Sequence, residues 1–215
     1  MQAREEVPMV KKSEERGSSK RSKTKQAVAL EQLAPEEVPE QLRPEFYFDF
    51  QARPFAHAGL FQWEGVNSVV TALGAIGNYA SDWLSRELPP RAKVAHLFED
   101  NFPKPCQAVG HFLIVLEPGA LCRPAQIVGS LETERPPHVL HLAQGARLVG
   151  VSVFLEEGDI FIGEGTTVEP GVGIKGPAII GKDCEVRQGA YLRGDVIVGE
   201  RATIRGELKN VVLMD

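Results

Sequence analysis

The hydrophobic pattern of this chain has a period of six residues between positions 162 and 209. From Ile162 to Ile204, every sixth position holds an aliphatic side chain. The position four residues after each of these is uncharged and mostly small, as at Thr166 and Cys184. A period of six differs from the 3.6-residue period of a helix and from the two-residue alternation of a strand. The pattern therefore predicts a repeating structure in which two residues of every six face inward.

A parallel β-helix explains this period, because each six-residue unit supplies one short strand and one corner. Three units make one triangular coil in known left-handed helices of this kind, so residue i lies over residue i+18. This register puts Gly163, Gly181 and Gly199 in one column, where glycine permits close approach or a positive φ. We expect a mainly β protein in which an α-helix and an irregular, β-rich lead-in precede a left-handed parallel β-helix.

The rest of the pattern divides the chain into four parts. Residues 1–26 are predicted to be a disordered basic tail, 27–60 a proline-rich extended linker, 61–150 a helix with a β-rich lead-in or cap, and 151–215 the β-helix. The tail is either solvated or an electrostatic tether for an anionic partner. Because the sequence stops within the repeat, we expect the β-helix to be truncated at its C-terminus.

One helix is predicted over residues 66–88. Asn67 or an adjacent residue caps its start, Pro89 stops it, and Gly74 and Gly77 either weaken it or allow close packing. Its apolar face, which we expect to pack on a core, consists of Val66, Val69, Val70, Leu73, Ile76, Ala80, Trp83 and Leu84.

An aromatic segment precedes this helix. Residues 46–50 read Phe-Tyr-Phe-Asp-Phe. This composition suits a short strand or a hydrophobic clasp, and we expect a clasp that packs on the helix.

Composition narrows the class of protein. Apolar residues make up 43% and charged residues 25% of the chain, as in soluble globular proteins. The net charge of −5 disfavours nucleic-acid binding. No apolar run approaches the roughly 20 residues of a membrane span, and the N-terminus shows no secretory signal. The three cysteines form no CxxC motif, so we expect reduced thiols in a cytoplasmic protein, with Cys184 packed inside the repeat.

Several kinds of catalytic site have no counterpart in the sequence. There is no GxxxxGK[ST] loop and no GxSxG elbow. No histidine falls within 162–209, which disfavours a metalloenzyme of the γ-carbonic-anhydrase kind. His138 and His141 are three residues apart, so in a strand they point to opposite faces. We therefore expect no metal site.

Cations gather on the outward positions of the repeat. Lys175 and Arg193 share one stacked column, Arg187 and Arg205 share another, and Lys209 is expected to lie over Tyr191. Cations on a rigid face suit phosphate or pyrophosphate, because arginine offers a planar fork and lysine a point charge. The tyrosine can stack on or hydrogen-bond a sugar or base. The alternative is a charged face that only confers solubility, in which Glu169 pairs with Arg187.

Residues 160–215 resemble the C-terminal left-handed β-helix of bacterial sugar-nucleotide enzymes. These are the glucose-1-phosphate thymidylyltransferase-like and N-acetylglucosamine-1-phosphate uridyltransferase-related proteins, in the variant that lacks a nucleotidyltransferase domain. The resemblance is carried by residues 162–171, 174–199 and 207–210, and by the helical segment 57–84. In the bifunctional relatives this domain transfers an acetyl group from acetyl-CoA to glucosamine-1-phosphate.

The resemblance implies roles for two residues. In these relatives an arginine in an LR(P)G segment and a lysine in a Glu-hydrophobic-Lys segment hold the sugar phosphate. Here Leu192-Arg193-Gly194 and Glu207-Leu208-Lys209 match those segments, so Arg193 and Lys209 are the implied phosphate ligands. Arg187, Arg205, Lys175 and Tyr191 are further candidates. The relatives' catalytic histidine lies further along the chain than the lysine, so the catalytic residue here stays unknown.

Two functions remain open at this stage. The first is a transferase domain for a sugar phosphate or nucleotide-sugar, which by resemblance uses acetyl-CoA and assembles as a homotrimer with its β-helices side by side. The second is a non-catalytic trimerisation and interaction module.

Overall fold

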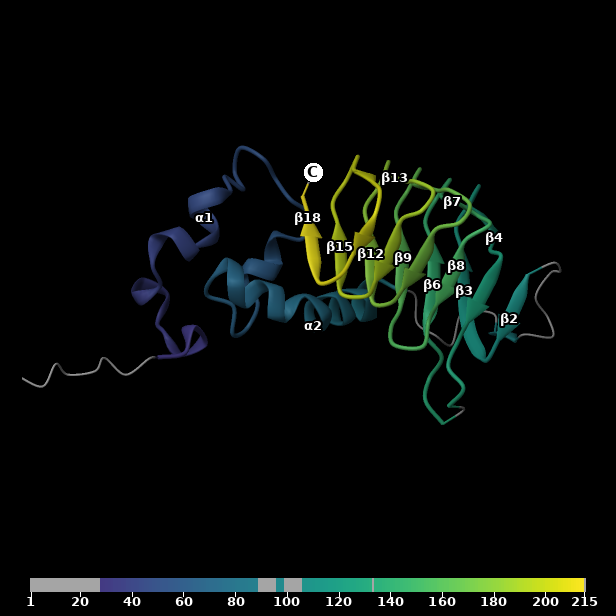
Figure 1. Cartoon of the computed structure of the whole chain (residues 1–215), viewed down its shortest axis with the longest axis horizontal. Coiled ribbons are helices and arrows are strands. Elements are labelled where there is room, and N and C mark those ends of the chain that lie inside the picture. Colours follow the sequence, from purple (N-terminus) through teal and green to yellow (C-terminus); the bar gives the residue numbers. More distant parts are fainter. Residues whose placement is uncertain (1–27, 89–95, 99–105, 133, 215) are drawn as a thin grey trace, which may run out of the picture.

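The computed structural model describes residues 28–88, 96–98, 106–132 and 134–214. The tail expected at 1–26 lies outside these residues. The described part is a parallel β-helix of about six turns with a helix alongside it (Figure 1). This confirms the predicted fold class and is consistent with a left-handed β-helix.

Three sheets form the sides of the β-helix. In spatial order, sheet A contains β1 (His96–Phe98), β3 (His111–Leu116), β6 (Val139–Leu142), β9 (Ile160–Ile162), β12 (Ala178–Ile180), β15 (Val196–Val198) and β18 (Val211–Leu213). Sheet B contains β2 (Gln107–Val109), β5 (Gln126–Val128), β8 (Ser152–Phe154), β11 (Gly173–Lys175), β14 (Tyr191–Arg193) and β17 (Glu207–Leu208). Sheet C contains β4 (Leu121–Arg123), β7 (Arg147–Val149), β10 (Thr167–Val168), β13 (Glu185–Val186) and β16 (Thr203–Ile204). All described pairings between these strands are parallel except that of β1 with β3.

The 18-residue register holds through the middle of the stack. Ile162 pairs with Ile180, and Ile180 with Val198. These three side chains are fully buried and belong to one core cluster inside the coils. The large aliphatic residue of each six-residue unit therefore fills the interior, as the pattern predicts.

The coils begin earlier than residue 151, where we expected the β-helix to start. Strand β2 pairs with β5, and β4 with β7, in the same parallel arrangement as the later strands. The spacing between stacked residues is irregular here, for example 26 residues from Leu116 to Leu142, because the loops differ in length. A fixed period of six cannot detect such coils.

Neighbouring coils contact each other through backbone atoms at the glycine column, which consists of Gly163, Gly181 and Gly199. A Cβ atom added at Gly163 would overlap the backbone of Gly181, and one added at Gly181 would overlap the backbone of Gly199. The small inward residues satisfy the same backbone: Thr166 Oγ1 donates to the Gly181 carbonyl (2.7 Å), and Cys184 Sγ donates to the Gly199 carbonyl (3.1 Å). Cys184 is buried and has a structural contact, as expected.

Helix α2 (Val69–Glu87) covers the outer face of sheet A (Figure 1). Ser68 is its N-cap and accepts a hydrogen bond from Thr71 N (3.1 Å), which confirms a cap adjacent to Asn67. The sheet meets the helix with an outward apolar column at Phe161, Ile179 and Ile197, one position before each inward aliphatic. The helix residues buried at this interface include Ala72, Ile76, Ala80 and Leu84.

Part of the predicted apolar face of α2 is exposed. Val70 and Leu73 are 53% and 45% accessible to solvent. The contact with sheet A is instead centred on Ile76, Ala80 and Leu84, and of the residues in the first turns Val70 and Leu73 point outward while Ala72 is buried.

The segment before α2 is folded into short helical turns rather than a plain extended linker. It contains η1 (Leu30–Gln32), η2 (Pro35–Glu37), η3 (Glu40–Leu42), α1 (Pro44–Tyr47) and η4 (Ala58–Gln62). Arg43 holds it together by donating to the carbonyls of Val38 (2.9 Å) and Glu36 (2.8 Å). Phe48 and Phe50 pack on Phe61 of η4, with ring centroids 5.9 and 5.3 Å apart, so this aromatic clasp lies beside the 3-10 turn that precedes α2.

Replacing each of the two glycines of α2 by alanine should change the free energy of unfolding differently. A Cβ at Gly74 meets open space, so Gly74→Ala should raise the free energy of unfolding by about 1 kcal/mol through helix propensity. A Cβ at Gly77 would overlap Oδ1 of Asp195, so Gly77→Ala should lose that gain or destabilise. Urea unfolding measures both. Asp195 has a φ of 53°, which glycine tolerates, so Gly77→Ala should regain its benefit in an Asp195→Gly background. Equal effects of the two single changes would contradict close packing at Gly77.

The Thr166 hydroxyl should contribute more to the free energy of unfolding than the methyl group of the same side chain does. It donates to Gly181 O and accepts from Cys184 N (2.9 Å), so Thr166→Val leaves one partly buried carbonyl and one buried N–H unpaired. We expect a loss of about 2 kcal/mol or more in urea unfolding. Thr166→Ser keeps the hydroxyl and should lose only about 0.8 kcal/mol for one buried methyl. A serine variant as unstable as the valine variant would show that packing dominates here.

Candidate functional site

The outer face of sheet B carries the strongest candidate site. Tyr191 and Arg193 lie on β14 on either side of the buried Leu192, so both side chains point outward. Lys175 of β11 is the register partner of Arg193. The structure therefore brings Lys175, Tyr191 and Arg193 together on one face, and we call this set the sheet B strip.

The ring of Tyr191 lies over Gly173. These residues are register partners, and a Cβ at Gly173 would be 2.7 Å from Cδ2 of the ring. Glycine at this position thus lets the ring lie across the sheet beside the two cations. The tyrosine stays 39% exposed, so its ring can contact a ligand.

Each cation of the sheet B strip has a carboxylate partner. Lys175 Nζ is 2.6 Å from Glu157 Oε1, and Arg193 Nη1 is 2.5 Å from Glu207 Oε1. The hydrogen bond to Glu157 raises the pKa of Lys175, and the hydrogen bond to Glu207 raises the pKa of Arg193. Glu157, Arg193 and Glu207 are exposed and Lys175 is partly exposed, and ion pairs at such positions contribute little stability. An incoming dianion can therefore displace the carboxylates at small cost.

The expected contact between Lys209 and Tyr191 is wrong. Strand β17 pairs Tyr191 with Glu207, and Leu192 with Leu208. The last coil is therefore shorter than 18 residues at this side, and Lys209 follows the partner of Leu192. This register places Lys209 at the end of the row that contains Arg193.

Arg187 and Arg205 lie on another side of the β-helix. They follow β13 and β16 of sheet C, and Arg187 N donates to Ile204 O (2.9 Å), which confirms that they stack. Arg187 forms an ion pair with Glu185 (2.6 Å), and this contact raises its pKa. Glu169, the partner that we considered, instead accepts from Gln188 N (2.8 Å). These arginines are not part of the sheet B strip.

The pairing of His141 with Glu117 was not expected from the sequence, where His141 was considered only as a disfavoured metal ligand. His141 lies on β6, and its Nε2 is 2.9 Å from Oε1 of Glu117, which follows β3. The coil spacing between β3 and β6 is irregular, so no periodicity could join residues 117 and 141 beforehand. His138 takes a different partner, Asp159 (3.1 Å), and no group of three metal-binding side chains occurs among the residues that the structure describes.

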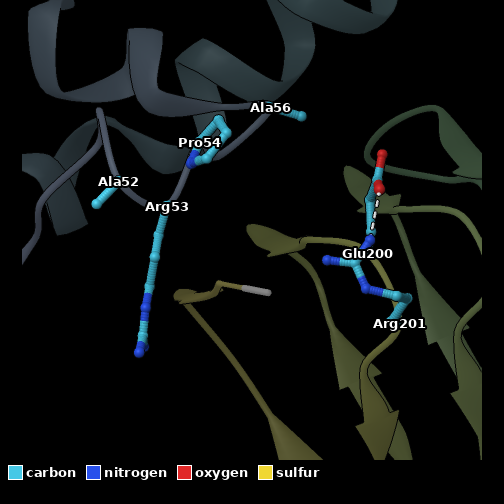
Figure 2. Close-up of a pocket in the computed structure, with 6 residues that line it drawn as sticks. All are labelled: Ala52, Arg53, Pro54, Ala56, Glu200 and Arg201. Atoms are coloured by element: carbon cyan, nitrogen blue, oxygen red, sulfur yellow. Dashed lines mark hydrogen bonds and ion pairs between the residues drawn. The ribbon is translucent and has the colours of Figure 1, made fainter.

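A groove of about 440 Å³ adjoins the Glu117–His141 pair. Its lining includes Trp83 of α2, Phe161 of β9 and the glycine column. A neighbouring space of about 640 Å³ separates the 52–56 segment from the turn after β15. Figure 2 shows Arg53 on one wall of that space and the ion-paired Glu200 and Arg201 on the other.

Comparison with known families gives one match. Residues 159–194, from the residue before β9 to the residue after β14, match the family described as Bacterial transferase hexapeptide (six repeats). This stretch is a hexapeptide-repeat β-helix domain. The match includes Lys175, Tyr191 and Arg193, and it supports a β-helix domain of the acyltransferase type. No curated protein and no solved structure matched the chain.

The described helices were compared with the requirements of a membrane span. Among the residues that the structure describes, none of the helices has the length and apolarity that crossing a bilayer requires.

Proposed function

We propose that this chain is the β-helix domain of a transferase that acts on a sugar-1-phosphate or nucleotide-sugar. In this proposal the sheet B strip binds the substrate phosphate. The observation that carries it is the adjacency of Lys175 and Arg193 on one outward face, beside the exposed ring of Tyr191. The hexapeptide match supports the acyltransferase type, and the sequence resemblance supports the sugar phosphate.

The chemistry of the strip fits a phosphate with an attached sugar. The Arg193 guanidinium can donate two parallel hydrogen bonds to phosphate oxygens, while Lys175 adds a point charge on the neighbouring coil. Lys209, at the end of the same row, supplies a further cation. The Tyr191 ring offers an apolar surface and a hydroxyl to the sugar. Binding requires that the phosphate replace Glu207 and Glu157 as partner of the cations.

The reaction and the assembly follow from the resemblance. We propose acetyl-CoA as the acyl donor and a homotrimer as the working assembly. We assign no general base. The three cysteines are free thiols, which suits the cytoplasm.

Substitutions on sheets B and C test the phosphate site. Arg193→Ala should weaken binding of glucosamine-1-phosphate at least about 10-fold, because a charge-assisted hydrogen bond is lost. Arg187→Ala is the matched control, since this arginine is also ion-paired and partly exposed but directly follows a strand of sheet C. Glu207→Gln should strengthen binding, because it releases Arg193. Titration calorimetry with the sugar phosphate and with inorganic phosphate measures these changes. Equal losses for both arginine variants would contradict a site on sheet B.

Turnover tests the transferase itself. Full-length protein with acetyl-CoA and glucosamine-1-phosphate should release free CoA, which is detected through its thiol group. The rate of CoA release should fall in the Arg193→Ala variant. Absence of turnover together with unchanged phosphate binding in Arg193→Ala would contradict the proposal.

A second candidate function is a non-catalytic trimerisation and interaction module. The exposed Val70 and Leu73 on α2 favour it, because an apolar stripe on a helix suits contact with another chain. Light scattering should then give the mass of a trimer, and titration calorimetry should detect no binding of sugar phosphate. A monomer at micromolar concentration would contradict this function.

A further inference from the structure

The groove beside the Glu117–His141 pair has the form of a small-molecule site. It lies between the C-terminal half of α2 and the corner of the β-helix where sheet A meets the glycine column. Its volume of about 440 Å³ falls within the range of ligand pockets, which is about 300–1,000 Å³. None of the cations proposed to bind phosphate lines it, so it is separate from the sheet B strip.

Aromatic rings form one wall of the groove. Trp83 and Phe161 meet edge to face, with centroids 5.4 Å apart and an interplanar angle of 74°. Phe161 meets His141 in the same way, at 5.3 Å and 88°. These contacts join α2 to two neighbouring strands of sheet A, so the wall is fixed by packing rather than carried by a loop. Ring faces of this kind attract cations.

The polar lining of the groove is predominantly acidic. It contains the carboxylates of Glu87, Glu117, Glu164 and Glu200 and one ammonium group, that of Lys182. Arg201 also pairs with Glu200 from outside the groove (3.0 Å), so four carboxylates face one lysine and one arginine. A concave surface lined by one sign of charge concentrates ions of the opposite sign.

His141 adds a buried nitrogen without a partner. Only 6% of this residue is exposed, and its Nδ1 has no hydrogen-bond partner among the described residues. A carboxylate can only accept, so Nε2 carries the hydrogen that is donated to Glu117. In the neutral ring, Nδ1 is then an acceptor that lacks a donor. An unpaired buried acceptor is unfavourable, and a small shift of the ring that let a ligand N–H reach it would remove this penalty.

We propose that this groove binds a small organic ammonium ion. The ammonium group lies among Glu117, Glu164 and His141, where it meets negative charge and the free acceptor. The apolar body of the ligand packs on Trp83 and Phe161. This site goes beyond the phosphate-binding function proposed for sheet B, and either can fail without the other.

Two probes of similar shape and opposite charge test the site. Phenethylamine carries an ammonium group, and 3-phenylpropionate carries a carboxylate on a similar body. The chain has two tryptophans, so a Trp63→Phe variant makes Trp83 the only source of tryptophan fluorescence. Phenethylamine should change this fluorescence saturably, with an affinity at least about 10-fold higher than that of phenylpropionate, because only the cation is attracted. Equal affinities, or no saturable change with either probe, would overturn the proposal.

Isosteric variants assign the effect to the groove. Glu117→Gln keeps an acceptor for His141 Nε2 but removes the charge, and it should weaken phenethylamine binding at least about 5-fold. Glu164→Gln, at an exposed position on the rim, should weaken it as well and serves if the first variant is unstable. Arg193→Ala should leave phenethylamine affinity unchanged, and Glu117→Gln should leave sugar phosphate affinity unchanged. Binding that is insensitive to both glutamate changes would overturn the site.

Discussion

The stacking of one coil's backbone on the next is the constraint on which this structure depends. Neighbouring coils touch through backbone atoms at the glycine column, where a Cβ added at Gly163 or Gly181 would overlap the next coil. Parallel hydrogen bonding then fixes the register, so the inward aliphatics form continuous columns. Thr166 and Cys184 satisfy the glycine carbonyls from inside. The interior of the β-helix is thus specified by small residues as much as by large ones.

The fixed register determines which side chains line each outer face of the β-helix. Each outward position repeats along a column, so a column of one residue type becomes a surface. Phe161, Ile179 and Ile197 form an apolar surface on sheet A, which α2 covers. Lys175 and Arg193 lie side by side on sheet B, each paired with a carboxylate. The rigid sheet thus places the phosphate ligands that we propose, whereas packing between α2 and sheet A builds the walls of the acidic groove.

The sequence predicts the parts of the site that follow the repeat. Adjacency of Lys175 and Arg193 follows from the 18-residue period and is confirmed. The placement of Lys209 over Tyr191 fails, because the last coil is shorter and pairs Tyr191 with Glu207. The carboxylate partners Glu157 and Glu207 were not expected either. Ion pairs depend on how far side chains extend from one coil to the next. The period of the sequence pattern gives no information on this.

The sequence by itself determined the β-helix between 162 and 209, the helix before it, and the inward role of Cys184. Each rests on a local rule, since a period of six or of 3.6 residues states which side chains face the interior. Only the tertiary structure decided that coils extend back to residue 107, that α2 lies on sheet A, and that Glu117 meets His141. These depend on loops of unequal length and on contacts between distant segments. No local pattern determines where such segments meet.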